Sequence, residues 1–316
     1  MTRITLRDNR LPHRPALGAP MPRRTLSLLT SLVAAVSAAS GGATAARADE
    51  QPVRYVALGD SYTAAPLTSF LQPGSPLGCI RGDLDYPTLI AKSLKPASFK
   101  DVSCSGAKTG HMTSAQTFSV GDPNPPQFDA LTEDTTLVTL TIGGNDIGFS
   151  KAVKCFTLSY SAPDGSPCKN SLTADGMDPF QQSIAKAAPD VGRTLAGIHE
   201  RSPKAKVYLL LYPLILPAEG SGCFPWVPIA KGDVPYLRGV QSQLNAMLTD
   251  EAAKNGVTVV DTTEPGHDTC QPDASKRWIE GVPTQWAAPA HPNQNGERAM
   301  AALTLAAYRT AASTAR

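Results

Sequence analysis

Residues 54–63 read RYVALGDSYT, an apolar run that ends at a glycine followed by short polar side chains. The run over residues 54–58 is nearly continuous, which is typical of a β-strand buried on both faces of a sheet. Gly59 permits a sharp turn, and Ser61 then lies beyond the strand's carboxyl end, where α/β proteins bind ligands. An isolated Gly-Asp-Ser is more often a plain helix cap, with Asp60 and Ser61 satisfying free N–H groups. These ten residues therefore predict a buried strand and a turn, and leave the role of Ser61 open.

Further apolar runs recur along the chain, at residues 100–103, 137–142, 206–211 and 257–260. Most of them are as continuous as the first run. They therefore predict four more strands that are buried on both faces.

Helical patterns lie between these runs. Asp178 and Pro179 supply an N-cap and a first helical residue, and Pro203 ends the helix that they begin. Apolar residues recur at three- and four-residue spacing over residues 237–248, and residues 298–311 predict an alanine-rich final helix. Strands that alternate with helices predict a parallel sheet covered on both faces. We therefore expect the α/β class, as a three-layer α/β/α sandwich around a mostly parallel five-stranded sheet.

Two long stretches, residues 66–84 and 151–177, contain cysteines and many turn-forming residues. They predict disulfide-tied surface loops. No internal repeat or low-complexity tract interrupts the chain after residue 48. We expect one domain over residues 49–316.

The first 48 residues have the composition of an export signal. Six arginines and one aspartate lie within residues 1–24, 16 apolar or small residues follow over 25–40, and Ala46-Arg47-Ala48 matches an A-x-A cleavage site. This order is that of a secretory signal peptide, and the apolar part is shorter than the roughly 20 residues that a bilayer span needs. We expect cleavage after Ala48 and a secreted, extracellular protein. Whether export follows the twin-arginine route stays open.

The charge of the chain argues against a nucleic-acid partner. The formal net charge is +2, but residues 1–48 carry seven arginines and one aspartate, so the mature chain has a net charge of −4. No excess of positive charge remains for a nucleic acid to bind. No later stretch is long and apolar enough to span a bilayer. We expect a monomer without stable membrane insertion, whose contact with a lipid interface is at most transient.

All six cysteines follow residue 48, and an even number in an exported protein predicts disulfides. Six cysteines allow 15 pairings, and the sequence does not choose among them. The sequential pairing, Cys79–Cys104, Cys155–Cys168 and Cys223–Cys270, closes loops of 25, 13 and 47 residues. In the chain-entropy account each bridge contributes about 3–4 kcal/mol. A metal site is disfavoured, because no two cysteines are spaced as C-x-x-C.

Polar groups follow other strands as well. Gly106 comes after the second apolar run, Gly143-Gly144-Asn145-Asp146 comes after the third, and His291 lies in a loop before the last helix. Each motif alone is a plausible turn or cap. Together, a hydroxyl, N–H donors and an imidazole at one edge of a sheet supply a nucleophile, an oxyanion site and a base.

Gly59-Asp60-Ser61-Tyr62, Gly106, Gly143-Gly144-Asn145-Asp146 and His291-Pro292-Asn293 resemble, in order and context, the four blocks of the SGNH (GDSL-type) hydrolases. The resemblance covers residues 53–305 and is strongest to secreted esterases and lipases of the actinomycete (Streptomyces) type. Those proteins also carry three disulfides and a stretch like Gly266-His267-Asp268-Thr269-Cys270. The resemblance implies a carboxylic ester hydrolase with a flavodoxin-like fold and no metal or cofactor, and we take the sequential disulfide pairing as our expectation.

The same resemblance assigns roles to single residues. Ser61 is the implied nucleophile, and His291 is the general base that activates it and then protonates the leaving alcohol. The backbone N–H groups of Ser61 and Gly106 and the side-chain amide of Asn145 are the implied oxyanion hole. Each such donor is worth roughly 2.7–4 kcal/mol of transition-state stabilisation.

One position departs from the family pattern. Many members have an aspartate three residues before the histidine, where this chain has Ala288. The imidazole still needs an acceptor for its Nδ1–H, and we expect the backbone carbonyl of Ala288 to be that acceptor in a Ser-His dyad. The alternative is a carboxylate recruited from elsewhere: Asp268, Asp261 or Asp273.

The leading hypothesis is a secreted serine esterase or lipase that acts on small-molecule or lipid acyl esters. Alternatives are a carbohydrate O-acetyl esterase, a phospholipase acting on phospholipid acyl esters, and a non-catalytic binding protein, although the last would predict a lost nucleophile or base. Several apolar residues near the motifs fit either an acyl-binding groove or the core, and the sequence does not decide between the two: Leu67, Phe70, Leu71, Phe118, Phe149, Phe156, Leu214, Ile215, Leu216 and Trp226.

Overall fold

Five parallel strands form one sheet in the structure, a computed structural model that describes residues 52–282 and 284–314. Their spatial order is β2-β1-β3-β4-β5, and every neighbouring pair is parallel. The strands are β1 Arg54–Gly59, β2 Ser98–Asp101, β3 Leu137–Thr141, β4 Lys206–Leu210 and β5 Thr258–Val260. The predicted five-stranded sheet is confirmed, and within the described residues it is parallel throughout.

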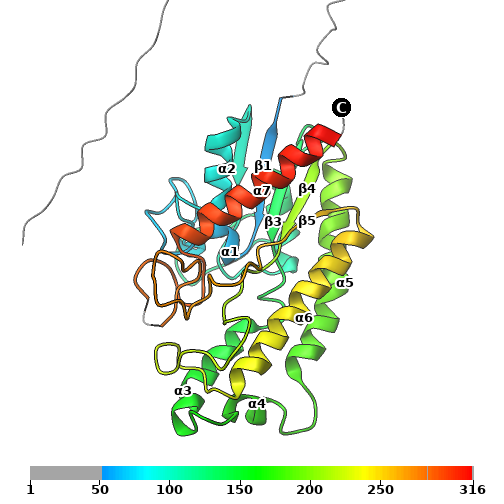
Figure 1. The fold of residues 1–316 in the computed structure, drawn as a ribbon. Helices are drawn as coiled ribbons and strands as arrows, with labels where there is room; N and C mark the ends of the chain where they lie inside the picture. Colours follow the sequence, from blue (N-terminus) through cyan, green and yellow to red (C-terminus); the bar gives the residue numbers. More distant parts are fainter. Residues whose placement is uncertain (1–51, 283, 315–316) are drawn as a thin grey trace, which may run out of the picture. The chain divides into compact units, whose positions relative to one another are not determined.

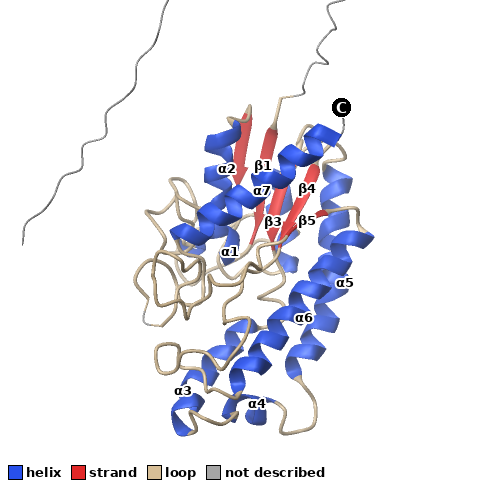
Figure 2. Ribbon diagram, viewed as in Figure 1, coloured by secondary structure: helices blue, strands red, loops and turns tan. Residues whose placement is uncertain are grey.

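Helices cover both faces of this sheet (Figure 1, Figure 2). On one face α2 (Tyr86–Leu94) packs against α7 (Gln294–Thr314). On the other face α5 (Pro179–Arg201) packs along α6 (Asp233–Lys254). The predicted three-layer α/β/α sandwich is confirmed.

Alternating side chains of the strands supply the two apolar cores. In β1, Tyr55 and Ala57 belong to the cluster under α2 and α7, whereas Val56 and Leu58 belong to the cluster under α5 and α6. Successive side chains of a strand point to opposite faces, so a strand that is apolar at nearly every position contributes to both layers. This is why the continuous apolar runs of the sequence correctly predicted a sheet buried on two sides.

The register of β1 and β3 brings two strand ends together. Gly59 is paired with Thr141, and the backbone N–H of Asp60 donates to the Thr141 carbonyl at 2.9 Å. The segment after β1, which contains Ser61, therefore lies directly beside the segment after β3, which contains Asn145. The remaining short elements lie in the connections: α1 Ser61–Ala64 and the 3₁₀ helices Leu77–Cys79, Thr109–Met112, Gln127–Ala130 and Phe149–Ala152.

The stretch 151–177 is largely helical, and its prediction as a surface loop was wrong. It contains α3 (Val153–Ser161) and α4 (Pro167–Leu172). The α4 helix begins at a proline, and the carboxylate of Asp233 accepts the N–H groups of Cys168 and Lys169, each at 2.9 Å. A cap supplied by a residue 65 positions away gives no local sequence signal.

Two element boundaries also differ from their predictions. β2 spans Ser98–Asp101, whereas the prediction placed this strand at residues 100–103. β2 is an edge strand and none of its residues is fully buried, so an apolar pattern does not mark its ends. α7 begins at Gln294, four residues before the predicted start. The side chain of Asn293 accepts the N–H groups of Asn295 and Gly296, so it caps the helix there.

The cysteines form three disulfides, Cys79–Cys104, Cys155–Cys168 and Cys223–Cys270, which is the sequential pairing. The proposed signal peptide, residues 1–48, lies outside the described residues. In the described part of the chain, none of the helices combines the length and the apolar character that crossing a bilayer demands.

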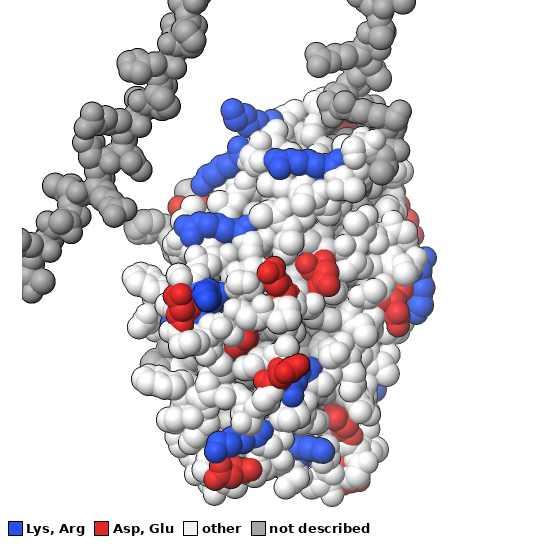
Figure 3. All heavy atoms as spheres, in the orientation of Figure 1, with Lys and Arg blue, Asp and Glu red and all other residues white. Residues whose placement is uncertain are grey.

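Charged side chains are sparse on the face drawn in Figure 3, where basic residues lie over α2 and α7 and both signs are mixed elsewhere. Most of this face is uncharged. This agrees with the low fraction of charged residues in the chain, 18%.

Candidate active site

Ser61 is the first residue of α1 and is placed by the turn at Gly59 and Asp60. Gly59 has φ +134°, and a Cβ on it would lie 2.4 Å from Thr63 Oγ1 and 2.6 Å from the Thr141 carbonyl oxygen. The turn therefore requires glycine. Asp60 is indeed a helix cap, because its Oδ1 accepts the N–H of Tyr62 at 2.9 Å. The capping interpretation of Gly-Asp-Ser is thus correct for Asp60, and the same cap directs Ser61 toward a cavity that it lines.

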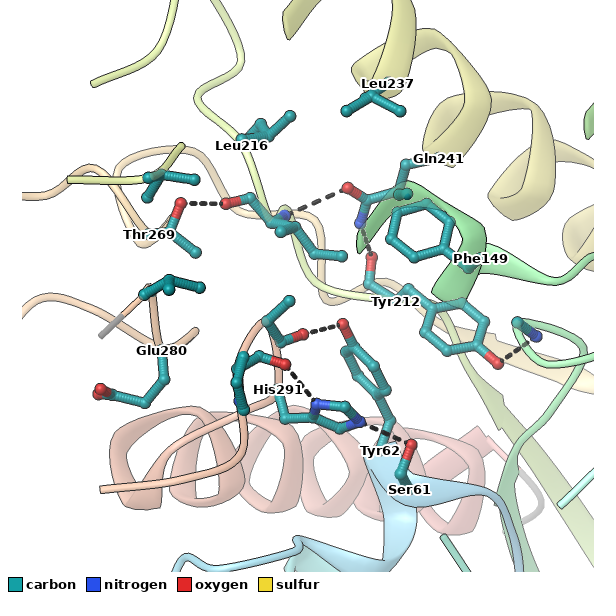
Figure 4. A pocket seen from close by; sticks show the side chains of 18 of the residues that line it. Ser61, Tyr62, Phe149, Tyr212, Leu216, Leu237, Gln241, Thr269, Glu280 and His291 are labelled. Carbon is teal, nitrogen blue, oxygen red and sulfur yellow. Dashed lines mark hydrogen bonds between the residues drawn. The ribbon is translucent and has the colours of Figure 1, made fainter. Parts of the chain in front are cut away.

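His291 reaches Ser61 from the loop before α7. Its Nε2 lies 2.8 Å from Ser61 Oγ, although the two residues are 230 positions apart in the chain. Figure 4 shows the imidazole ring between the Ser61 hydroxyl and the backbone of its own loop. This is the contact that a hydroxyl nucleophile and its general base need.

The prediction that the Ala288 carbonyl orients the imidazole was wrong. His291 Nδ1 is 2.7 Å from the carbonyl oxygen of Pro289, whereas the Ala288 carbonyl accepts the backbone N–H of His291 at 3.2 Å. Ala290 has φ +58°, so the loop makes a tight left-handed turn that brings the ring back under Pro289. A carbonyl only accepts, so Nδ1 carries the proton and Nε2 is left to accept the hydrogen of Ser61.

The alternative carboxylates are engaged elsewhere. Asp268 accepts from the Cys270 N–H and the Gln271 side chain, while Asp261 and Asp273 each accept from the hydroxyl residue two positions later. No carboxylate among the described residues is hydrogen-bonded to His291. The geometry is therefore that of a dyad with a neutral carbonyl as the third group.

Tyr62 holds the histidine loop in place. Its hydroxyl donates to the Ala290 carbonyl at 2.5 Å, and its ring centroid lies 5.1 Å from that of His291. No sequence pattern assigns a structural role to Tyr62. The only available signal was its position directly after Ser61, which does not reveal a partner 228 residues away.

The surroundings favour a neutral imidazole. Burial lowers the pKa of His291 below its usual value, and the hydrogen bond to the Pro289 carbonyl opposes this only in part. A histidine that stays unprotonated near neutral pH is a competent proton acceptor.

Two of the three predicted oxyanion donors lie on residues that line the cavity. Ser61 and Asn145 both line the cavity, and Asn145 Nδ2 uses one hydrogen to donate to the Ala107 carbonyl at 3.0 Å, which leaves its second hydrogen for a ligand. Gly106 lies in the exposed turn before Ala107, with φ +78°, and is not among the residues that line the cavity. The Asn145–Ala107 hydrogen bond nevertheless fixes this turn beside Asn145.

The cavity next to Ser61 has a volume of about 200 Å³ and a mainly apolar wall. Four of the ten residues that fitted either a groove or the core line it: Phe149, Phe156, Ile215 and Leu216. Phe118 packs against the core, Leu214 is partly buried outside the cavity lining, and Leu67, Phe70, Leu71 and Trp226 are exposed. Leu237 of α6 also contributes to the apolar wall (Figure 4), as does Leu244 of the same helix. Among the described residues, no group of three or more histidine, cysteine or acidic side chains is arranged to hold a metal ion.

Comparison with known families matches residues 57–299 to the GDSL-like lipase/acylhydrolase family. The chain belongs to this family. The match contains the Ser61 turn, the Asn145 turn and the His291 loop. A member of the GDSL-like lipase/acylhydrolase family is a carboxylic ester hydrolase, and the fold and the predicted resemblance are both confirmed.

Individual relatives agree with this assignment. The chain is 40% identical over 299 residues to Lipase 2 of Streptomyces coelicolor, which covers 90% of this chain and 98% of the relative. It is 27% identical to an esterase of Streptomyces scabiei over 90% of this chain and 93% of the relative. The crystal structure of phospholipase A1 from Streptomyces albidoflavus NA297 superimposes with a TM-score of 0.64 at 26% identity, over 81% of this chain and 99% of the other.

Proposed function

We propose that the protein is a secreted serine hydrolase that cleaves carboxylic esters through an acyl-enzyme on Ser61, with His291 as the general base. The observation that carries the proposal is the 2.8 Å contact between Ser61 Oγ and His291 Nε2. The Nδ1–H of His291 donates to the Pro289 carbonyl, so the other ring nitrogen, Nε2, is free to accept the hydroxyl proton of Ser61.

The reaction follows from this geometry. Ser61 Oγ attacks the ester carbonyl as His291 Nε2 takes the hydroxyl proton, and the imidazolium then gives that proton to the leaving alkoxide. A water molecule, deprotonated by the same nitrogen, releases the acid and restores Ser61. The negative charge on the carbonyl oxygen is stabilised by the N–H groups of Ser61 and Gly106 and the Asn145 amide, each worth roughly 2.7–4 kcal/mol.

The substrate is an ester with an apolar acyl chain. The wall of the cavity beside Ser61 includes Phe149, Phe156 and Leu237. Contact of such an apolar surface with hydrocarbon instead of water is favourable. A lipase relative at 40% identity supports a lipid ester. The structural likeness to a phospholipase A1 keeps phospholipid acyl esters as the second candidate.

We further propose that the protein is a monomer. We also infer export, with cleavage after Ala48. Three disulfides support an oxidising compartment.

A fluorophosphonate probe tests the proposal. Protein recovered from the culture medium should begin at Asp49 and carry one adduct per chain, on Ser61. Ser61→Ala should lose the adduct and roughly 10⁴-fold or more of the esterase activity, whereas Ser114→Ala, an exposed serine outside the site, should keep both. Full activity of Ser61→Ala, or an adduct on another residue, would refute the mechanism.

A further inference from the structure

The Tyr212 hydroxyl lies between the two turns that carry Ser61 and Asn145. The residue follows β4, and its side chain is buried. Its hydroxyl donates to Asp60 Oδ2 at 2.6 Å and accepts the Gly144 N–H at 2.7 Å. Figure 4 shows the second of these bonds at the end of the ring. The phenol thus makes one bond to each turn.

Each of these partners is adjacent in sequence to a site residue. Asp60 directly precedes Ser61, and Gly144 directly precedes Asn145. The distance between the two turns is therefore bridged by one oxygen atom and two short hydrogen bonds. The fit is tight, since a Cβ on Gly144 would lie 2.9 Å from the Tyr212 hydroxyl oxygen.

Tyr212 is itself anchored to α6. Its backbone N–H donates to Asn245 Oδ1 at 3.0 Å, and its carbonyl accepts from the side-chain amides of Asn245 and Gln241 at 2.9 and 3.1 Å. The backbone of Tyr212 is therefore fixed independently of both turns. A rigidly held phenol can impose a spacing on flexible turns, whereas a mobile one would follow them.

We propose that Tyr212 is a positioning residue that sets the spacing of Ser61 and Asn145 through its bonds to Asp60 and Gly144. This inference rests on the proposed function. Without the hydroxyl, the buried Gly144 N–H loses its acceptor and the Asp60 carboxylate loses one of its two donors, so both turns relax. Oxyanion donors act only when they are accurately placed, and a displacement of about 1 Å can cost roughly 10²-fold in rate.

The test is Tyr212→Phe, which removes one oxygen atom and keeps the ring. We expect kcat on a p-nitrophenyl ester to fall by roughly 10- to 100-fold with KM within twofold, because substrate binding precedes the formation of the oxyanion. Tyr208→Phe is the matched control, because Tyr208 lies on β4 but belongs to the core cluster under α2 and α7. The kcat of this variant should stay within about twofold of the wild type. Loss confined to KM, or no loss of kcat, would overturn the inference.

A second variant tests the inference even if Tyr212→Phe does not fold. Asp60→Asn breaks the same hydrogen-bond network from the other side and should also lower kcat. In the double variant Asp60→Asn/Tyr212→Phe the loss should not exceed the larger single loss, because Tyr212→Phe already removes the hydrogen bond that Asp60→Asn disrupts. Losses that multiply would overturn the inference, and if Tyr212→Phe does not fold, an unchanged kcat of Asp60→Asn would do so. A wild type that hydrolyses no ester and takes no phosphonate refutes the proposed function itself, whereas an active wild type with unaffected variants refutes only this role of Tyr212.

Discussion

At Gly59 the backbone leaves β1 with φ +134°, and there is no room for a side chain. Gly74 has a similarly positive φ, +78°, but a Cβ there would meet nothing within 4 Å. A side chain at Gly59 would therefore meet both backbone strain and a steric clash, whereas one at Gly74 would meet strain alone. Only Gly59 controls where Ser61 begins α1.

We predict that Gly59→Ala destabilises the protein by about 3–5 kcal/mol, from backbone strain together with the clash against Thr63 and Thr141. Gly74→Ala should cost only about 1–2 kcal/mol, from strain alone. Urea unfolding measures both free energies. Equal costs at the two positions would contradict the requirement for glycine after β1.

Single residues differ in how well the sequence reveals them. The positions of Ser61 and Asn145 could be predicted, because each follows a strand and the carboxyl ends of parallel strands meet at one edge of the sheet. His291 precedes α7, and the resemblance of its His-Pro-Asn block to the family assigned its role. Tyr62 and Tyr212 could not, because each acts through a hydrogen bond to a residue that is remote in the chain. The choice of Pro289 over Ala288 depends on the left-handed turn at Ala290, which its sequence does not indicate.

Helices and strands were predictable where burial is uniform. β1, β3 and β4 are buried along nearly their whole length, and their apolar runs identified them. The helices α3 and α4 were missed because they lie outside the sandwich, and α4 depends on a cap from Asp233 at the start of α6. Local patterns do not carry such long-range capping.

The contact between α7 and α2 places an ionisable side chain in the core. Glu297 in the first turn of α7 is fully buried, and its Oε2 accepts the N–H of Tyr86 at the start of α2 at 2.7 Å. Burial raises the pKa of Glu297 well above its usual value, and the N–H of Tyr86 opposes this only in part. The native state therefore binds a proton more tightly than the unfolded chain does.

This fixes the sign of a pH effect on stability. The stabilisation from protonated Glu297 is fully present below the unfolded pKa of 4.5 and declines as the pH rises toward the native pKa. Glu297→Gln, which never ionises, should gain unfolding free energy relative to the wild type as the pH rises from 5 to 8. The exposed Glu219→Gln is the control and should show no such trend. A difference that is flat with pH would show that Glu297 is not a buried acid.

Two regions of different construction meet at the cavity. The turns that carry Ser61 and Asn145 belong to the strand ends of the sandwich, whereas Phe149 and Phe156 come from the helical segment over residues 149–172 (Figure 1). The Cys155–Cys168 disulfide joins α3 to α4 within that segment, one residue from Phe156. The disulfide therefore supports the apolar cavity wall, where we propose that the acyl chain binds, and does not touch the Ser61–His291 pair.

We predict that Cys155→Ser/Cys168→Ser changes selectivity more than chemistry. The lost cross-link costs about 3 kcal/mol in the chain-entropy calculation, and the loosened wall should lower kcat/KM for dodecanoyl esters by roughly tenfold more than for acetyl esters, the equivalent of about 1.4 kcal/mol of acyl-chain contact. A series of p-nitrophenyl esters measures the ratio. Equal losses for both chain lengths would show that this wall does not bind the acyl group.

The separation of these regions bears on how such proteins diversify. Exchanges within residues 149–172 should alter which acyl chain is admitted, because Phe149 and Phe156 line the cavity, and these residues lie outside the hydrogen-bonded turns after β1 and β3. Replacing residues 149–172 with the corresponding residues of a homologue should therefore change which ester is preferred. The Ser61–His291 contact should persist in each chimera, because neither residue belongs to the exchanged segment.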